Sequence, residues 1–310
     1  MPPTTGAMIY GPDVSLPGGR SMRYVANQTF AEVWNIWDSK CGGGLYWSRN
    51  QAKSAGYKST ITNVQQMLLG AQLTDVTKDQ TYVKNADQVF QWLKSAGLLT
   101  ADGSLYDGID AAENCKISRP LYSYNAGLLL GAFGWMYKVT NQQSYIQEAS
   151  TVLKQTLNYF SKDGIITDPC EPNCPLNSAQ FKGALIRGLG FLYEFTPDQT
   201  QKQQIKDVLS KSVQAMLKVC DNDWNCGGFW YLGQQPAAKS VHDQMNAAEL
   251  MTAYYKTFGI QMKSGITPPA GAKNATTGGN VGTIPQGGAG DAYPSLLAMS
   301  FTALLAALFA

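Results

Sequence analysis

The sequence predicts an all-α fold in which helical hairpins repeat around an α/α toroid. Apolar residues recur at helical spacing in about eight segments, whereas the alternation that is typical of strands is hardly seen. The segments come in pairs, and loops rich in Gly or Asp separate one pair from the next. The eight segments cover residues 22–38, 60–76, 79–96, 122–139, 142–160, 178–195, 198–219 and 241–258.

An internal repeat supports the hairpin interpretation. The stretch Gly134–Tyr137 (GWMY) recurs 56 positions later as Gly190–Tyr193 (GFLY), and Gly127 matches Gly183 at the same offset. Repeated hairpins with cysteine-bearing loops on one side are typical of an α/α toroid, whose hollow face suits an extended polymer. A stacked solenoid of hairpins is the alternative.

Composition divides the chain into four regions. The first region is rich in Pro and Gly and has no periodic pattern, and the composition changes again after Gln261. We expect an irregular N-terminal segment (1–21), a helical toroid domain (22–260), a flexible linker rich in Gly, Pro and Thr (261–290) and a hydrophobic tail (291–310).

The tail predicts attachment to a glycosylphosphatidylinositol (GPI) anchor. Its uncharged stretch Leu296–Ala310 would form a helix of about 22 Å, shorter than the roughly 30 Å core of a bilayer. Small residues, a polar spacer and a terminal apolar stretch together form the pattern of an anchor signal. Asn280 and Gly288 are the candidate attachment sites. The alternative is a terminal helix that packs against the domain.

The beginning of the chain lacks the feature that an anchored protein needs. An anchored protein enters the secretory pathway through a signal peptide, which begins with a basic residue followed by an apolar stretch. This pattern does not follow Met1. We therefore expect that the start is truncated. The expected location is the cell surface or cell wall, with the protein anchored to the outer face of the plasma membrane.

The six cysteines predict three disulfides. Their even number and close spacing are typical of a secreted protein, and the absence of CxxC disfavours the alternative of a zinc site. Two of them open similar sequences, CGGGLYW at Cys41 and CGGFWY at Cys226. The expected pairs are Cys41 with Cys115, Cys170 with Cys174, and Cys220 with Cys226.

Two glycosylation sequons agree with a secreted protein. They begin at Asn27 and Asn274. Because the net charge is only +2 and no run of like charge occurs, we expect no binding to nucleic acid. We expect the protein to be a monomer.

Several kinds of chemistry are disfavoured by missing motifs. The chain has one histidine, His242, and no Gly-x-Ser-x-Gly sequence, so a Ser-His-Asp triad has no local support. Nucleotide-binding glycine loops and HExxH are also absent from the sequence, and we predict no cofactor and no metal. We expect His242 to be a loop or helix-cap residue.

Carboxylates remain as candidates for chemistry. Glycosidic bonds are cleaved by a pair of carboxyl groups, one acting as acid and the other as nucleophile or base. The segment Leu105–Cys115 holds three acids beside an aromatic residue and a cysteine, and we expect it to be a loop. Asp107 and Asp110 are the candidates for ligand contact there. The alternative is that they cap the next helix or lie in solvent.

Seven motifs in order resemble the family 76 glycoside hydrolases, the fungal endo-α-1,6-mannanase group that includes lipid-anchored cell-wall enzymes. They extend over about Met22 to Phe258. The motifs are the WDxxCGGGLYW segment Trp37–Trp47, Tyr57-Lys58 with Ile61 and Asn63, Tyr106–Gly108 leading to Asn114-Cys115, Tyr122–Gly127, Cys170–Pro172 through Cys174, Phe181–Gly183, and Gln244-Met245 with Ala248-Glu249.

The resemblance implies an (α/α)6 toroid and retaining cleavage, or transfer, of α-1,6-mannan in the fungal cell wall. It also implies a catalytic pair of adjacent aspartates before the helix that resembles residues 22–38, but the sequence contains no Asp-Asp, and the nearest acid upstream is Asp13. A toroid of this type has twelve helices. The missing signal peptide, helices and acid pair together predict that the N-terminal third is absent.

Two functions follow as hypotheses. The first is a mannan endo-1,6-α-mannosidase whose present chain is inactive because it lacks the aspartate pair. The second is a non-catalytic, wall-anchored protein that binds glycans or has a structural role. The residues expected to contact a mannan or mannose-rich glycan are Trp47, Asp107, Asp110, Tyr124, Asn125, Lys182 and Gln244.

Overall fold

The computed structural model describes residues 11–16, 18–50, 56–175, 178–233 and 240–259. Within these ranges eight α-helices confirm the eight predicted segments to within about one helical turn. The helices are α2 (Met22–Trp34), α4 (Thr60–Thr77), α5 (Gln80–Ser95), α6 (Ser123–Thr140), α7 (Gln143–Phe160), α8 (Phe181–Phe195), α9 (Gln199–Leu217) and α10 (Val241–Phe258). The strands are β1 (Tyr57–Ser59), β2 (Tyr106–Asp110), β3 (Lys116–Leu121), β4 (Ser161–Lys162) and β5 (Ile165–Ile166).

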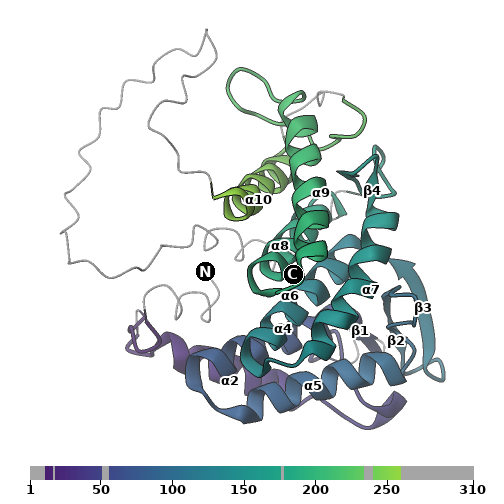
Figure 1. Ribbon diagram of the computed structural model, residues 1–310. Helices are drawn as coiled ribbons and strands as arrows, with labels where there is room; N and C mark the ends of the chain where they lie inside the picture. Colours follow the sequence, from purple (N-terminus) through teal and green to yellow (C-terminus); the bar gives the residue numbers. More distant parts are fainter. Residues whose placement is uncertain (1–10, 17, 51–55, 176–177, 234–239, 260–310) are drawn as a thin grey trace.

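Inner and outer helices alternate along the chain. The helices α4, α6, α8 and α10 pack side by side, and α5, α7 and α9 return along the outside of this layer. Figure 1 shows an open arc with α2 at one end and α10 at the other. The inner helix α6 is buried continuously from Asn125 to Met136, whereas the outer helix α7 buries one apolar face. This alternation is that of the predicted α/α toroid.

The repeated glycines let neighbouring inner helices approach closely. A Cβ atom on Gly127 of α6 would lie 2.2 Å from the Cα of Leu185 of α8, and one on Gly188 would lie 1.7 Å from the carbonyl oxygen of Gly127. Gly183 has the same role one helix further on, because a Cβ there would lie 2.7 Å from Oδ1 of Asn246 in α10. The sequence repeat is therefore a repeat of contacts between helices.

A three-stranded sheet was missed in the sequence. Strands β1, β2 and β3 form an antiparallel sheet in that order, although two helices separate β1 from β2 along the chain. The strands are short, and β2 carries Asp and Gly, which local patterns assign to loops. The expectation that Asp107 and Asp110 lie in a loop was therefore wrong, because both lie on β2.

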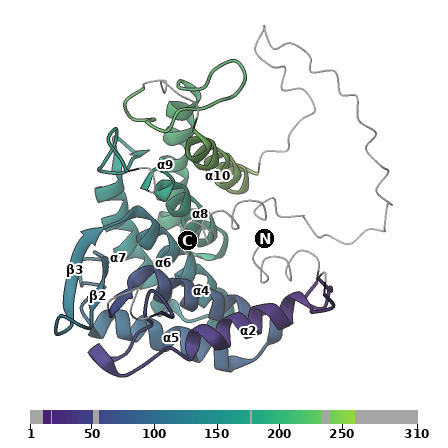
Figure 2. The ribbon, with the colours of Figure 1, turned by 180° about the vertical axis from the view of Figure 1, so that it is seen from behind.

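The strands gather at one side of the arc. Figure 1 places β2, β3 and β4 at the right of the molecule, and the reverse view in Figure 2 places β2 and β3 at the left. Since β1 runs directly into α4 and β3 leads into α6, the sheet lies at the N-terminal ends of these inner helices.

The three predicted disulfides are confirmed. Their Cα–Cα distances are 5.5 Å for Cys41–Cys115, 4.8 Å for Cys170–Cys174 and 3.9 Å for Cys220–Cys226. The first disulfide ties the loop before β1 to the turn between β2 and β3, and it closes a sequence separation of 74 residues. Covalent closure of such a long segment restricts the unfolded chain and stabilises the folded one.

Several predicted features lie outside the described residues: the linker and tail, the sequon at Asn274, and the anchor sites Asn280 and Gly288.

The sequon at Asn27 lies on α2, where the hydroxyl of Thr29 donates to the carbonyl of Val25 at 2.9 Å. Among the helices of the described ranges, none has both the length and the apolar character required to cross a membrane.

Candidate functional site

Polar and aromatic side chains meet at the N-terminal ends of three inner helices. The hydroxyl of Tyr57, on the strand β1 that runs into α4, donates to Asp107 on β2. Tyr124 in the first turn of α6 packs against Phe181, the first residue of α8, with ring centres 4.3 Å apart. These contacts bring together residues that are far apart in the sequence.

Asp107 is the centre of this arrangement. Its carboxylate accepts hydrogen bonds from the Tyr57 hydroxyl at 2.6 Å, the Tyr124 hydroxyl at 3.1 Å and Nδ2 of Asn125 at 3.2 Å. The pairing of β2 with β3 is irregular next to Asp107, and such irregularities redirect side chains near functional sites. The structure thus brings together three of the predicted site residues, namely Asp107, Tyr124 and Asn125.

The two tyrosines remain protonated donors. Burial raises the pKa of both the Tyr57 and the Tyr124 hydroxyls, and the negative charge of Asp107 raises them further. A carboxylate offers about four lone-pair positions, and these two hydroxyls and Asn125 occupy three of them. The fourth position of Asp107 can therefore accept a hydrogen bond from a ligand hydroxyl.

Asp110 lies on the same strand but has a different environment. Its Oδ1 accepts from the backbone N–H groups of Ala112 at 2.8 Å and Glu113 at 3.2 Å. These contacts shape the turn that joins β2 to β3, as Asp side chains commonly do. Asp107 and Asp110 therefore serve different parts of the fold.

The other predicted site residues are more widely spread. Trp47 is 41% exposed, and its backbone N–H donates to the backbone carbonyl of Tyr57 at 2.9 Å, which places it beside β1. Gln244 lies on α10, where Nε2 donates to the carbonyl of Trp224 at 3.1 Å. Lys182 is 2% exposed, and its ammonium donates to Glu171 at 2.8 Å.

A buried group of acids around Lys182 was missed in the sequence. Burial raises the pKa of the Asp168 carboxyl to about 6, against the opposing effects of Ser123 and Lys182. Burial also raises the pKa of Asp243 at the start of α10. The motif Cys-Glu-Pro points to Glu171, but Asp168 in an irregular segment and Asp243 in the first turn of α10 carry no local signal of a site.

Two buried acceptors lie in this region without a hydrogen-bond partner in the described part of the chain. They are Oδ1 of Asn125 and Oε2 of Glu171. Unsatisfied buried oxygens are costly, and water or a ligand hydroxyl would relieve them. The described residues contain no group of three or more His, Cys, Asp or Glu side chains that could hold a metal ion.

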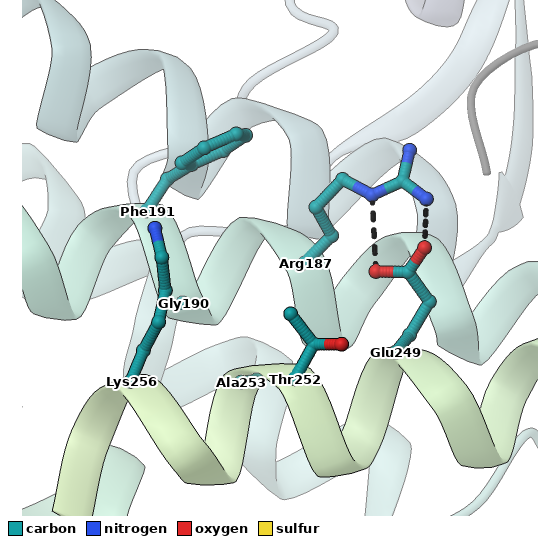
Figure 3. A pocket seen from close by; sticks show the side chains of 7 residues that line it. All are labelled: Arg187, Gly190, Phe191, Glu249, Thr252, Ala253 and Lys256. Carbon is teal, nitrogen blue, oxygen red and sulfur yellow. Dashed lines mark hydrogen bonds and ion pairs between the residues drawn. The ribbon is translucent and has the colours of Figure 1, made fainter. Parts of the chain in front are cut away.

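A small pocket lies between α8 and α10, away from the predicted site residues. Figure 3 shows Arg187 and Glu249 facing each other across it. Nε of Arg187 donates to Oε2 of Glu249 at 3.1 Å, and the two side chains are 5% and 7% exposed. The pair joins the two helices, and the pocket is lined by Arg187, Gly190, Phe191, Glu249, Thr252, Ala253 and Lys256.

Several curated proteins are similar to this chain in sequence. The chain is 30% identical to mannan endo-1,6-alpha-mannosidase DFG5 of Saccharomyces cerevisiae, over 72% of this chain and 51% of that protein. It is also 30% identical to the Saccharomyces cerevisiae protein DCW1, which has the same activity name, over 74% of this chain and 53% of that protein. The chain thus spans about half the length of these curated relatives.

Solved structures show the same fold. Dfg5 from Chaetomium thermophilum in complex with glucosamine is 26% identical, with a TM-score of 0.74 over 82% of this chain and 65% of that chain. An inactive variant of the α-1,6-mannanase GH76A of Salegentibacter sp., in complex with α-1,6-mannotriose, is 18% identical, with a TM-score of 0.68 over 76% of this chain and 69% of that chain.

The resemblance predicted from seven motifs is confirmed by a match that covers most of the helical domain. Residues 15–259 match the family described as glycosyl hydrolase family 76. The match includes β1, β2 and all inner helices of the described part. It therefore includes the residues around Asp107. This chain belongs to glycosyl hydrolase family 76.

Proposed function

We propose that this chain is the mannan-binding part of a mannan endo-1,6-α-mannosidase. The observation that carries the proposal is the Asp107 carboxylate, held by Tyr57, Tyr124 and Asn125 with one acceptor position left. The names of the relatives give the substrate class, α-1,6-linked mannan. Trp47 is exposed beside β1, which carries Tyr57, and it offers a ring to the glycan.

Cleavage requires a second feature that the sequence lacks. Glycosidases of this kind use two carboxyl groups in defined positions, and the sequence contains no Asp-Asp. The inactive Salegentibacter variant carries asparagine in place of two adjacent aspartates and was solved with a bound trisaccharide. By analogy, we expect this chain to bind mannan without hydrolysing it. A non-catalytic glycan-binding protein of the wall is the second candidate function, and the missing pair favours it.

Binding is tested by calorimetry with α-1,6-mannotriose. We expect the wild-type chain to bind and Asp107→Asn to lose about tenfold or more in affinity, since it loses hydrogen bonds to a charged group. Asp110→Asn on the same strand is the matched control and should bind nearly as the wild type does. A folded wild-type chain that binds no mannotriose would contradict the proposal.

Hydrolysis is tested separately. The chain is incubated with α-1,6-mannan, and new reducing ends are measured with the Salegentibacter mannanase as the positive control. We expect no product from this chain. Product formation would show that carboxyl groups other than an adjacent aspartate pair perform the reaction.

We further propose that the protein is glycosylated and held by a GPI anchor at the outer face of the plasma membrane or in the wall. The three disulfides support passage through an oxidising compartment, and the sequons and the tail pattern agree with it. Release of the protein from cells by a phosphatidylinositol-specific phospholipase tests the anchor. Retention of the protein after complete digestion of a known anchored marker would contradict it.

A further inference from the structure

Two loops of this protein are built on the same plan. The first glycine loop comprises residues 41–47 (CGGGLYW), and the second glycine loop comprises residues 226–231 (CGGFWY). Each begins at a cysteine that forms a disulfide, Cys41 with Cys115 and Cys226 with Cys220. The two loops lie near the N-terminal ends of inner helices, because Lys58 on β1, just before α4, holds the first loop and Lys182 in the first turn of α8 holds the second.

A buried lysine fixes the first glycine loop. Lys58 is fully buried, and its ammonium donates to the carbonyl of Gly43 at 2.6 Å and to the carboxylate of Asp38. The same ammonium lies 4.7 Å from the centre of the Tyr46 ring. A cation over an aromatic ring is stabilising when it is removed from water.

The second glycine loop repeats each of these contacts. The ammonium of Lys182 donates to the carbonyl of Gly228 and to Glu171, and it lies 4.3 Å from the centre of the Trp230 ring. Lysine, glycine carbonyl, carboxylate and buried aromatic ring therefore recur together. The two loops therefore share their lysine contacts, although their backbones differ, because Gly43 has a φ of 138° and Gly228 has no positive φ.

Each loop then presents one exposed aromatic side chain. Tyr46 is 4% exposed and the next residue, Trp47, is 41% exposed; Trp230 is 1% exposed and the next residue, Tyr231, is 36% exposed. Buried rings under the lysines fix the loop backbone, so the neighbouring exposed ring is held without much loss of conformational freedom on binding. Such a ring is a suitable platform for the apolar face of a sugar.

The loops flank the Asp107 site on two sides. The residue before Lys58 is Tyr57, which donates to Asp107, and the residue before Lys182 is Phe181, which packs against Tyr124. The first loop is thus tied to the site through β1 and the second through α8.

On the basis of the proposed mannan binding, we infer that Tyr231 is a second sugar-stacking platform, equivalent to Trp47. A mannan chain then extends from the Asp107 site toward both loops. Short oligosaccharides occupy the centre alone, and longer ones also contact Tyr231. The ammonium of Lys162 lies 5.4 Å from the centre of the Tyr231 ring and helps to hold the ring.

The test compares affinities for α-1,6-mannotriose and α-1,6-mannohexaose by calorimetry. We expect the wild-type chain to bind the hexasaccharide more tightly. Tyr231→Ala should lose about tenfold in affinity for the hexasaccharide and less than about twofold for the trisaccharide. Tyr231→Phe keeps the ring and should retain the wild-type affinities.

Tyr159→Ala is the matched control, because Tyr159 is an exposed tyrosine on the outer helix α7, and it should change neither affinity. Thermal unfolding of each variant establishes that it is folded. Equal affinities of wild type and Tyr231→Ala for the hexasaccharide would overturn the inference and leave the proposed function intact. Equal losses for both sugars would also overturn it, because Tyr231 would then belong to the centre. A wild-type chain that binds neither sugar would overturn both proposals.

Discussion

Two aspartates show how the environment of a residue decides its role. Asp107 accepts hydrogen bonds from three side chains, so its negative charge is well satisfied. Asp168 is 6% exposed, and burial raises its pKa to about 6. The first is suited to ligand recognition through its hydrogen bonds, whereas the second changes its protonation state near pH 6.

The raised pKa of Asp168 predicts a dependence of stability on pH. Between the ordinary value of 3.8 and about 6, the folded state holds a proton on Asp168 that the unfolded state has released. The free energy of unfolding therefore falls as pH rises through this window, by up to about 3 kcal/mol from this group.

Urea denaturation at several pH values measures this contribution. The free energy of unfolding of Asp168→Asn should depend less on pH between 4 and 6 than that of the wild type. The reason is that the variant lacks the carboxyl whose pKa is higher in the folded state than in the unfolded state. The exposed Asp223 provides the control variant Asp223→Asn, which should follow the wild type. A pH dependence that Asp168→Asn leaves unaltered would disagree with this assignment.

The buried pair of Lys182 and Glu171 predicts a strong effect of removing one charge. Their side chains are 2% and 5% exposed, so Lys182→Met leaves an unpaired buried carboxylate and should cost about 3–5 kcal/mol of unfolding free energy. The double variant Lys182→Met/Glu171→Gln should recover part of the loss.

Chemical denaturation of the single and double variants measures the effect. Lys256→Met is the control, because Lys256 and Glu194 form a more exposed pair, 25% and 44% exposed, which contributes about 1 kcal/mol or less. Similar losses in Lys182→Met and Lys256→Met would mean that burial does not control the strength of these pairs.

At the scale of elements, the packing of inner helices depends on single glycines. Gly188 of α8 lies against the backbone of α6, whereas a Cβ at Gly190, two residues further along, would lie 3.6 Å from the Cβ of Ala253 in α10. The first distance leaves no room for a methyl group, and the second is an ordinary contact. The same helix thus offers a position that excludes alanine and one that accepts it.

Thermal unfolding of two alanine variants tests this difference. Gly188→Ala should lose about 3 kcal/mol or more, because the backbones of α6 and α8 must separate. Gly190→Ala should be neutral or gain up to about 1 kcal/mol from the higher helix propensity of alanine. Equal stabilities of the two variants would be incompatible with the close approach of these helices.

At the scale of the whole molecule, the described part is an open arc whose last helix leaves an apolar face exposed. Met251, Tyr255 and Phe258 of α10 are 44%, 45% and 39% exposed and follow one another at helical spacing. Repeat folds need a polar cap on their terminal repeats, and this face of α10 is apolar. Exposed apolar stripes of this kind lower solubility.

We therefore expect the purified chain to be poorly soluble and Met251→Glu/Tyr255→Glu to be more soluble at an unchanged melting temperature. Precipitation assays and sedimentation at increasing concentration measure this. Tyr159→Glu, on the outer helix, provides the comparison and should have a smaller effect. A wild-type chain that remains a soluble monomer at high concentration would show that this face does not drive association.

Much of the fold could be predicted because helices depend on residues close in sequence. Ser59, Asp79 and Asp198 accept from backbone N–H groups at the starts of α4, α5 and α9, and the apolar spacing marks each helix. The strand β2 could not be predicted, because its partner β1 lies beyond two helices.

The candidate site was predicted only in part for the same reason. Asp107, Tyr124 and Asn125 stand in recognisable motifs, and the structure brings them together. Asp168 has no motif, and its raised pKa arises from burial among residues that fold around it. The role of Lys182 in holding a loop likewise depends on Gly228, which is distant in sequence.

By itself, the sequence determined the helices, the disulfide pairs and the family, because these depend on local periodicity, on the spacing of a few cysteines and on ordered motifs. The tertiary structure alone decided that Asp107 faces three donors, that Asp168 is buried and that Lys58 and Lys182 each hold a glycine loop. These properties arise from contacts between distant residues, whose energies depend on burial and geometry that no local pattern contains.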